Sequence, residues 1–308
     1  MDQLAGTAAF ITGGAQGIGL GIARALRGQG VRLALVDVDR DALRAAEVVL
    51  GAGPEVATFE FDVRDRSRFA EAAAEAERRL GPISVLCNNA GIVFPESVDD
   101  MTYDLWDLTL GINLGGVING VQTFLPRMLE RGTPAHIVNT ASAAGLVAAV
   151  GYMYSTSKYA VVGLSESLRN QLQAAGAPVG VTVLCPGAVA TKIASSTCRA
   201  FTEPGGAEGL SKARHRVERL TPKVEATLAT YGVAPDHVGD LVLEAIREDR
   251  LYVHTDRAGI DLIKARTQAL LDAMPTAPGP SGDFADFRAS IHGENGSHRH
   301  AAEPTKEA

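Results

Sequence analysis

Residues 8–19 read AAFITGGAQGIG, a short apolar run and a glycine-rich turn that opens a helical pattern. This order predicts a β-strand, a turn and an α-helix. Gly13, Gly17 and Gly19 have the spacing G-x-x-x-G-x-G. Glycines in such a turn let a pyrophosphate approach the backbone, and the helix N-terminus favours its negative charge. The alternative is a turn that only packs the helix onto a sheet.

A second apolar run, from Val31 to Val36, ends in Asp37, 18 residues after Gly19. A carboxylate at this place would accept hydrogen bonds from an adenosine ribose, whereas a structural Asp37 would be an ordinary turn residue. The glycine turn ahead of it favours the ribose role. Because the charge of Asp37 would repel a 2′-phosphate, the predicted cofactor is NAD, with Arg40 as the one residue that argues for NADP.

Apolar runs alternate with helical patterns along the rest of the chain. This alternation predicts an α/β domain over residues 1–274, with a parallel sheet of about seven strands and helices on both faces. The predicted strands are residues 8–12, 31–37, 56–62, 83–89, 135–141, 181–185 and 251–255. The predicted helices are residues 17–29, 40–50, 67–80, 102–131, 152–175, 235–248 and 258–274.

Tyr154 and Lys158 lie in GYMYSTSKYA, residues 151–160, which belongs to one of these helices. Positions i and i+4 share a helix face, so the lysine ammonium would lie near the phenol and favour its ionised form. A tyrosine tuned in this way would take a proton from an alcohol. The spacing alone is common in helices, and it is the motifs upstream that favour a catalytic pair.

Taken together, the chain resembles the short-chain dehydrogenase/reductase family over about residues 4–255. The resemblance is carried by TGGAQGIG at residues 12–19, NNAG at 88–91, Asp62 with Val63, Asn113 in GINLGG, Ser142 in NTAS, the tyrosine and lysine, and Pro186 and Gly187 with Thr191. The family implies a Rossmann-like sheet of order 3-2-1-4-5-6-7. It also implies hydride transfer between a nicotinamide cofactor and an alcohol or ketone.

The resemblance also assigns site residues. Tyr154 would act as general base or acid, Lys158 would lower its pKa and bind the nicotinamide ribose, Ser142 would orient the substrate oxygen, and Asn113 would support a water-linked proton path. In structural roles, Ser142 would bond the backbone at a strand end and Asn113 would mark a helix kink. The implied cofactor-binding residues are Gly13, Gln16, Gly17, Ile18, Gly19, Asp37, Asp62, Val63, Asn89, Ala90, Gly91, Tyr154, Lys158, Pro186, Gly187, Val189 and Thr191.

The substrate is predicted to be a bulky, hydrophobic secondary alcohol or ketone. The stretch WDLTLGINLGGVINGVQTFLPRML, residues 106–129, resembles a subgroup with aryl and terpenoid secondary-alcohol dehydrogenases. The predicted substrate-pocket residues are mostly apolar: Ser142, Ala144, Leu146, Tyr152 and Tyr154. The alternatives are a hydroxysteroid or terpenoid alcohol dehydrogenase of the same family, or an NAD(H)-binding sensor without turnover.

Composition excludes several other classes. The net charge is −7 and no basic cluster stands out, so nucleic acid is not an expected partner. The three cysteines lack metal or redox spacing, which predicts no metal site and reduced thiols in a cytoplasmic protein. No signal peptide or membrane span is expected. A homodimer or homotetramer that pairs through the helices at residues 102–131 and 152–175 is expected from the family.

Two segments depart from the alternation. Residues 192–234 are predicted to form a substrate lid, and their basic run KARHRVER is interpreted as a solvated helix face rather than an anion site. Residues 275–308 are rich in proline, glycine and charge and are predicted to be disordered. Three histidines of that tail, His292, His298 and His300, are expected to be solvated rather than to bind metal.

Overall fold

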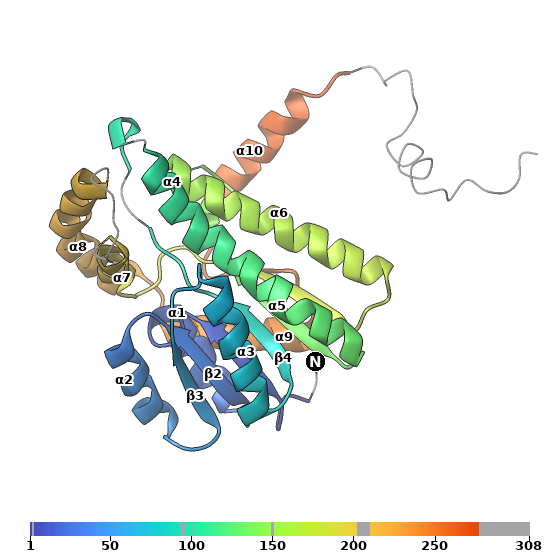
Figure 1. Cartoon of the computed structure of the whole chain (residues 1–308). Helices are drawn as coiled ribbons and strands as arrows, with labels where there is room; N and C mark the ends of the chain where they lie inside the picture. The colour runs from blue at the N-terminus through green and yellow to red at the C-terminus, as the bar shows by residue number, and fades with distance from the viewer. Residues whose placement is uncertain (2, 94–95, 101, 149–150, 202–209, 277–308) are drawn as a thin grey trace, which may run out of the picture. The chain divides into compact units, whose positions relative to one another are not determined.

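The computed structural model describes residues 1–308 except 2, 94–95, 101, 149–150, 202–209 and 277–308 (Figure 1). The chain divides into two compact units, Met1–Ile263 and Lys264–Ala308. The first unit holds the whole sheet, and most of helix α10 (Ile260–Asp272) belongs to the second. The predicted disorder of the tail and its three histidines fall outside the described residues, apart from positions 275 and 276.

The core of the first unit is a seven-stranded parallel sheet of order β3-β2-β1-β4-β5-β6-β7. This confirms the predicted fold class and strand order. The strands are β1 (Ala8–Thr12), β2 (Arg32–Asp37), β3 (Val56–Glu60), β4 (Ile83–Asn88), β5 (Ala135–Thr140), β6 (Val179–Cys185) and β7 (Tyr252–His254). Because all the strands run parallel, their carboxyl ends meet at one edge, where α/β proteins bind ligands.

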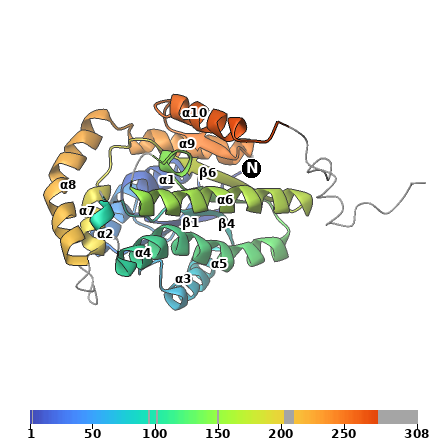
Figure 2. The ribbon, with the colours of Figure 1, turned by 90° about the horizontal axis from the view of Figure 1, so that it is seen from above.

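Helices cover both faces of the sheet. They are α1 (Gly17–Arg27), α2 (Arg40–Leu50), α3 (Arg66–Leu80), α4 (Tyr103–Leu110), α5 (Gly116–Arg131), α6 (Tyr152–Ala174), α7 (Ile193–Ala200), α8 (Ser211–Tyr231) and α9 (Pro235–Glu248). Helices α3, α5 and α6 lie side by side on one face, while α1 and α9 pack on the other (Figures 1 and 2). The chain thus places α1 and α2 on one face, crosses to the other face for α3, α5 and α6, and returns to the first face with α9.

The period-2 alternation of strand side chains divides the core in two. Along β1, Phe10 belongs to the apolar layer under α3 and α5, whereas Ile11 belongs to the layer under α1 and α9. Phe10 packs against Phe124 with ring centroids 4.8 Å apart and against Phe69 at 5.6 Å. Each of these fully buried side chains contributes about 1.5–3 kcal/mol through removal of apolar surface from water.

The predicted helix at residues 102–131 is interrupted in the structure. Between α4 and α5 the backbone makes a five-residue π-helical turn, η2 (Gly111–Gly115), with Asn113 at its centre. A π turn holds one more residue than an α turn and is frequent at functional sites. Tyr103–Arg131 is long and apolar enough to pass for a membrane span, but 44% of its most apolar window is buried inside the structure. A helix that packs on a sheet can pass the same test of length and composition, so this one helix is weak evidence for a membrane span.

Residues 192–234 are more regular than the predicted loop. They contain α7 and the 21-residue helix α8, with residues 202–209 between them outside the described part. Helix α8 was not predicted from the sequence because its apolar positions are few and Pro222 lies within it. Lys212, Arg214 and His215 of the basic run are exposed, in agreement with a solvated helix face.

Candidate functional site

A cavity of about 740 Å³ opens at the carboxyl edge of the sheet. Eighteen of the residues assigned from the sequence line it: Gly13, Gln16, Gly17, Ile18, Asp37, Asp62, Val63, Asn89, Ala90, Gly91, Ser142, Ala144, Tyr154, Lys158, Pro186, Gly187, Val189 and Thr191. Four others, Gly19, Asn113, Leu146 and Tyr152, are not among the lining residues. Motifs spread over the chain therefore converge on one cleft.

The glycine turn is shaped by close backbone approaches. Gly13 has φ +60°, and a Cβ there would lie 3.0 Å from Cα of Ala90. A Cβ at Gly19 would overlap the carbonyl oxygen of Gly13, so Gly19 lets helix α1 pack against its own turn. Gly13 thus lines the cavity, whereas Gly19 is not a lining residue and packs against the backbone of Gly13. Both positions leave the first turn of α1 open towards the cavity.

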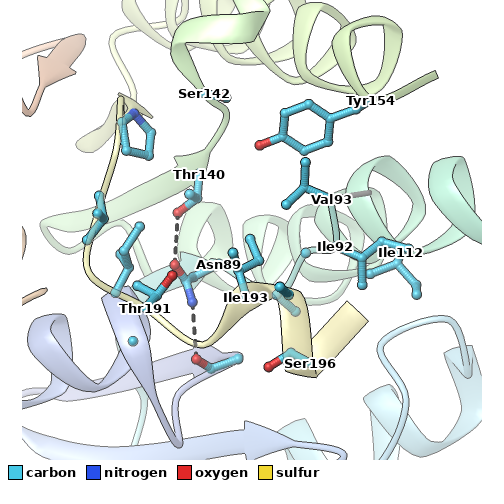
Figure 3. Close-up of a pocket in the computed structure, with 18 of the residues that line it drawn as sticks. Asn89, Ile92, Val93, Ile112, Thr140, Ser142, Tyr154, Thr191, Ile193 and Ser196 are labelled. Carbon is cyan, nitrogen blue, oxygen red and sulfur yellow. Dashed lines mark hydrogen bonds between the residues drawn. The ribbon is translucent and has the colours of Figure 1, made fainter. Parts of the chain in front are cut away.

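Thr12 and Asn89 join the ends of β1 and β4 beneath this turn. The Thr12 hydroxyl accepts hydrogen bonds from the backbone amides of Asn89 (2.9 Å) and Ala90 (3.1 Å). The Asn89 side chain donates to the carbonyl of Gly13 at 3.1 Å and accepts from Thr140 at 3.3 Å, as the dashed lines of Figure 3 show. Thr12 and Thr140 were not assigned roles from the sequence, although both are strand-end threonines beside motif residues.

Asp37 places a carboxylate at the end of β2 in the cavity wall. Its oxygens accept from the backbone amides of Ala15 (3.3 Å) and Asp39 (3.2 Å). Burial raises the pKa of Asp37, and these backbone hydrogen bonds act in the opposite direction. A half-buried carboxylate of this kind is an acceptor for hydroxyl donors and disfavours a second negative group.

Two arginines near this end of the cavity are engaged by carboxylates. Arg40 forms an ion pair with Glu60 on the adjacent strand β3. Arg64 donates from Nε to Asp62 at 2.8 Å, and its backbone amide bonds the same carboxylate at 2.8 Å. Arg40 thus has a carboxylate partner on the surface of the molecule, at an exposed pair that contributes little to stability.

Tyr154, Ser142 and Lys158 meet on the other side of the cavity. The Ser142 side chain is near enough to the phenol of Tyr154 to oppose the rise of its pKa, and Figure 3 shows the phenol oxygen pointing towards the Ser142 side of the cleft. The Lys158 ammonium donates to the carbonyl of Thr140 at 3.0 Å and lies 5.8 Å from the centroid of the Tyr154 ring. Ser142 also accepts from the amide of Ala144 at 3.1 Å, so its backbone-bonding role is real as well.

The electrostatics of this group differ from the expectation that Lys158 lowers the pKa of Tyr154. Burial raises the pKa of Tyr154, and the opposing effect comes from the side chain of Ser142. Burial also lowers the pKa of Lys158 to about 8. The reason for the difference is that the i, i+4 spacing says nothing about desolvation, which here penalises both charged forms.

Asn113 lies fully buried in the π turn, behind the cavity wall. Its side chain accepts from the amide of Ile92 at 2.8 Å and donates to the carbonyl of Ile92 at 3.0 Å and to Ser157 at 3.1 Å. A Cβ at Gly91 would lie 3.2 Å from Asn113 Oδ1 and 3.4 Å from Lys158 Nζ. Gly91, which has no side chain, thus lies between the side-chain amide of Asn113 and the ammonium of Lys158. We call this side of Gly91 its open face.

Helices α7 and α8 complete the cavity wall, a contribution that the sequence predicted only as a lid. Gln16 of the glycine turn donates to Ser196 of α7 at 3.1 Å, and the amide of Val93 donates to Thr197 at 3.1 Å. The α8 residues of the wall recur at helical spacing: Val217, Leu220, Thr221, Val224 and Leu228. This stripe would have been visible only with α8 recognised as a helix.

Two predicted substrate residues lie elsewhere. Tyr152 begins α6 and packs against Trp106 of α4 with ring centroids 5.9 Å apart. Leu146 packs against the apolar layer below. Val147, which the sequence also offers as a wall residue, lines the cavity together with Ile92 and Val93. Within the described part of the chain, no group of three His, Cys, Asp or Glu side chains is arranged to hold a metal ion.

Comparison with known proteins agrees with this geometry. Residues 7–200 match the family model described as short chain dehydrogenase. A C alpha-dehydrogenase from a Sphingobium species is 31% identical, over 89% of this chain and 88% of its own length. A 1-deoxy-11-beta-hydroxypentalenate dehydrogenase from Streptomyces avermitilis is 32% identical, over 80% of this chain and 84% of its own. A short chain dehydrogenase/reductase from Burkholderia phymatum in complex with NAD is 33% identical, with a TM-score of 0.79 over 91% of this chain and 99% of that one.

The chain belongs to the short-chain dehydrogenase/reductase family. It is an oxidoreductase of the kind that acts on alcohol-type small-molecule substrates.

Proposed function

We propose that this protein transfers a hydride between NAD(H) and the carbinol or carbonyl carbon of a bulky, hydrophobic secondary alcohol or ketone. The observation that carries the proposal is the convergence of Tyr154, Ser142 and Lys158 with the glycine turn and Asp37 on one cavity. The proton-transfer group, Tyr154, and the glycine turn that would bind the dinucleotide therefore line the same cavity. The named dehydrogenase relatives support the reaction class.

The cofactor assignment is supported by the chemistry of the cavity wall. The open turn at Gly13 and Gly17 would hold the pyrophosphate, and the half-buried Asp37 carboxylate would bond the free 2′-hydroxyl of NAD. The ion pair of Arg40 with Glu60 leaves NADP without an obvious cation from that residue. The Burkholderia phymatum relative, whose structure is a complex with NAD, agrees with this choice.

The proposed chemistry divides the work among four side chains. Tyr154 takes the hydroxyl proton during oxidation and returns it during reduction, while Ser142 aligns the substrate oxygen with the phenol. Lys158 binds the nicotinamide ribose and passes the proton to water near the open face of Gly91. Asn113 stabilises the wall of this proton path through its two hydrogen bonds to the backbone of Ile92. The nicotinamide ring would supply the hydride acceptor for oxidation and the donor for reduction.

The raised pKa of Tyr154 has a consequence for rate. A phenol that is neutral at pH 7 is a good proton donor for ketone reduction and a weak base for alcohol oxidation. Oxidation should therefore speed up as the pH rises, and reduction should slow down. Because Tyr154 and Lys158 are close, the profile will report the pKa values of the pair rather than of one residue.

The substrate class rests on the wall that α8 provides. Val217, Leu220, Val224 and Leu228 present apolar side chains to the cavity, and Ile92 and Val93 add to them on the side of β4. A cavity with this lining suits a hydrophobic ring system better than a sugar or a hydroxy acid, which would need more polar partners. A hydroxysteroid or a terpenoid alcohol would also suit this lining.

We further propose a cytoplasmic homodimer or homotetramer. Among the apolar residues of the two helices at 102–131 and 152–175, Leu105, Leu108 and Val161 are buried within the chain, so they are not available for an interface. Four others are only partly buried and would lie at the interface: Leu110, Leu114, Leu164 and Leu168. The buried free thiols of Cys87 and Cys185 support a reducing compartment.

The test is a panel of aryl, terpenoid and steroid alcohols and ketones, with NAD and with NADP, followed by the absorbance of the reduced cofactor. The expected result is turnover of a hydrophobic secondary alcohol with NAD. Tyr154→Phe should lower kcat by about 10²–10⁴-fold while NADH binding, measured by fluorescence, stays the same. Residual activity within about tenfold of wild type would remove Tyr154 from the mechanism.

The sensor alternative makes a different prediction in the same assay. A protein that binds NADH with micromolar affinity and turns over no member of the panel would favour the sensor. Preference for a sugar or a hydroxy acid would contradict the apolar pocket without touching the hydride-transfer assignment.

A further inference from the structure

The loop after β4 contacts three parts of the site in turn. Asn89 bonds the glycine turn, Ile92 bonds Asn113 in the π turn, and Val93 bonds Thr197 of α7. The loop then reaches Glu96, beyond two positions that the structure does not describe. We call residues 89–93 together with Glu96 the β4 strap. Since its contacts come from separate segments, the strap couples their positions.

Glu96 bonds the first turn of α6. Its Oε2 accepts from the amide of Met153 at 2.7 Å, and its Oε1 accepts from the amide of Tyr154 at 2.8 Å. The first amides of a helix have no partner inside the helix and need acceptors from elsewhere. The N-cap residue of α6 is Gly151, which offers no side-chain hydrogen bond. The carboxylate of Glu96 takes the place of a local cap from 57 residues away.

The space beside Gly151 independently supports the role of Glu96 as a cap of α6. A Cβ at this position would lie 2.5 Å from Cδ of Glu96 and 2.8 Å from its Oε1. Glycine here leaves the space through which the carboxylate reaches the helix end. A negative charge at the N-terminus of a helix is also favoured by the helix dipole.

We propose that Glu96 is a positioning residue that sets the place of Tyr154 relative to Ser142 by holding the first turn of α6. The inference rests on the proposed function of Tyr154 as the proton-transfer group. Ser142 follows β5, whereas Tyr154 is carried by α6, and both line the cavity, so the distance between their hydroxyl groups depends on how α6 is placed relative to β5. Two charge-assisted bonds to the amide of Tyr154 and its neighbour fix that placement.

The test uses graded variants of this one residue. Glu96→Ala removes both acceptors, while Glu96→Gln keeps the length of the side chain and one acceptor oxygen. We expect kcat to fall about 10²-fold in the alanine variant and about tenfold in the glutamine variant, because a small misplacement of a reacting group is costly. The Michaelis constant for NAD should stay within about twofold of wild type, since the glycine turn and Asp37 are not touched.

Asp65→Ala is the matched control. Asp65 caps helix α3 through a bond of 3.0 Å from the amide of Arg68, and it does not line the cavity. It therefore removes a carboxylate cap with no link to Tyr154, and kcat should not change. If Glu96→Ala loses stability as Asp65→Ala does but keeps kcat within about threefold of wild type, the positioning role is wrong.

A second measurement separates failure of this inference from failure of the proposed function. Hydrogen exchange of the amides of Met153 and Tyr154, in the protein without ligands, should be faster in Glu96→Ala than in wild type or Asp65→Ala. Unchanged exchange would overturn the role of Glu96 even if no substrate is found. A third outcome is faster exchange in Glu96→Ala together with a wild-type protein that turns over no alcohol. It would confirm the contact between Glu96 and α6. It would also reject Tyr154 as the proton-transfer group, and with it the positioning role of Glu96.

Discussion

Replacing Lys158 with methionine is expected to change how the stability of the protein depends on pH. The ammonium is 3% exposed and has one described hydrogen bond, to the carbonyl of Thr140. Burial lowers the pKa of Lys158 from 10.5 to about 8. At about 1.36 kcal/mol per pKa unit, this shift corresponds to about 3 kcal/mol of unfavourable free energy for holding the charge in the folded state at neutral pH.

The pH window follows from the direction of the shift. Below about pH 8 the lysine is protonated in both states and the full cost is present. Between about pH 8 and 10.5 the unfolded chain binds the proton more tightly than the folded one, so stability rises with pH. The wild type should therefore gain about 2 kcal/mol relative to Lys158→Met between about pH 7.5 and about pH 10.

At neutral pH the two effects of the substitution oppose each other. Methionine removes the cost of the buried charge, but it leaves the carbonyl of Thr140 without the ammonium, which costs about 1–3 kcal/mol. The net expectation is a variant that is equal to wild type or more stable by up to about 2 kcal/mol, and inactive. A residue retained at this cost fits a role in turnover rather than in folding.

Urea unfolding at a series of pH values measures the effect as a difference between the variant and wild type. Other titrating groups cancel in this difference. Lys212→Met, which replaces an exposed lysine of α8, is the control and should track wild type. Parallel curves for wild type and Lys158→Met from about pH 7.5 to about pH 10 would refute the reasoning, because they would mean that burial does not perturb this ammonium.

Four further outcomes are expected. Asp37→Ala should raise the Michaelis constant for NAD at least about tenfold and relax discrimination against NADP in steady-state kinetics, whereas a wild type that prefers NADP would contradict the charge argument. Burial lowers the pKa of His136 from 6.5 to about 4, so about 3 kcal/mol of stability should be present above pH 6.5 and lost as the pH falls through 4. His136→Gln should flatten this loss in urea unfolding, and identical slopes would count against it. The amides of α8 should exchange more slowly with NAD and an alcohol substrate bound, and equal exchange would leave a closing role for residues 192–234 without support. Light scattering at micromolar concentration should give the mass of a dimer or tetramer, and a monomer mass would rule out the proposed assembly.

The sheet was predictable because its strands carry strong local signals. The strand from Ala8 to Thr12 is fully buried on both faces, and glycines or aspartates mark the turns that follow several strands. Parallel strands that are apolar throughout leave little choice about which segments form the core. The cavity followed from the same signals, since residues at the carboxyl ends of parallel strands must come together.

What the sequence could not predict depends on contacts across the chain. The partners of Glu96 lie 57 and 58 residues away, and no periodicity points to them. The wall that α8 provides needs the helix to be recognised despite Pro222 and a mostly polar surface. The effect of Lys158 on Tyr154 was misjudged for a related reason, because burial is a property of the folded molecule and not of a spacing.

The π turn at Gly111–Gly115 makes the length of the helix it interrupts hard to change. Each residue of an α-helix turns the chain by about 100°, so removing one residue to restore regular α geometry would rotate α4 by about that angle relative to α5. Asn113 would then lose its two bonds to Ile92, or Trp106 would leave Tyr152. Related chains should therefore keep this number of residues, and insertions or deletions should fall on the loops that flank the two helices.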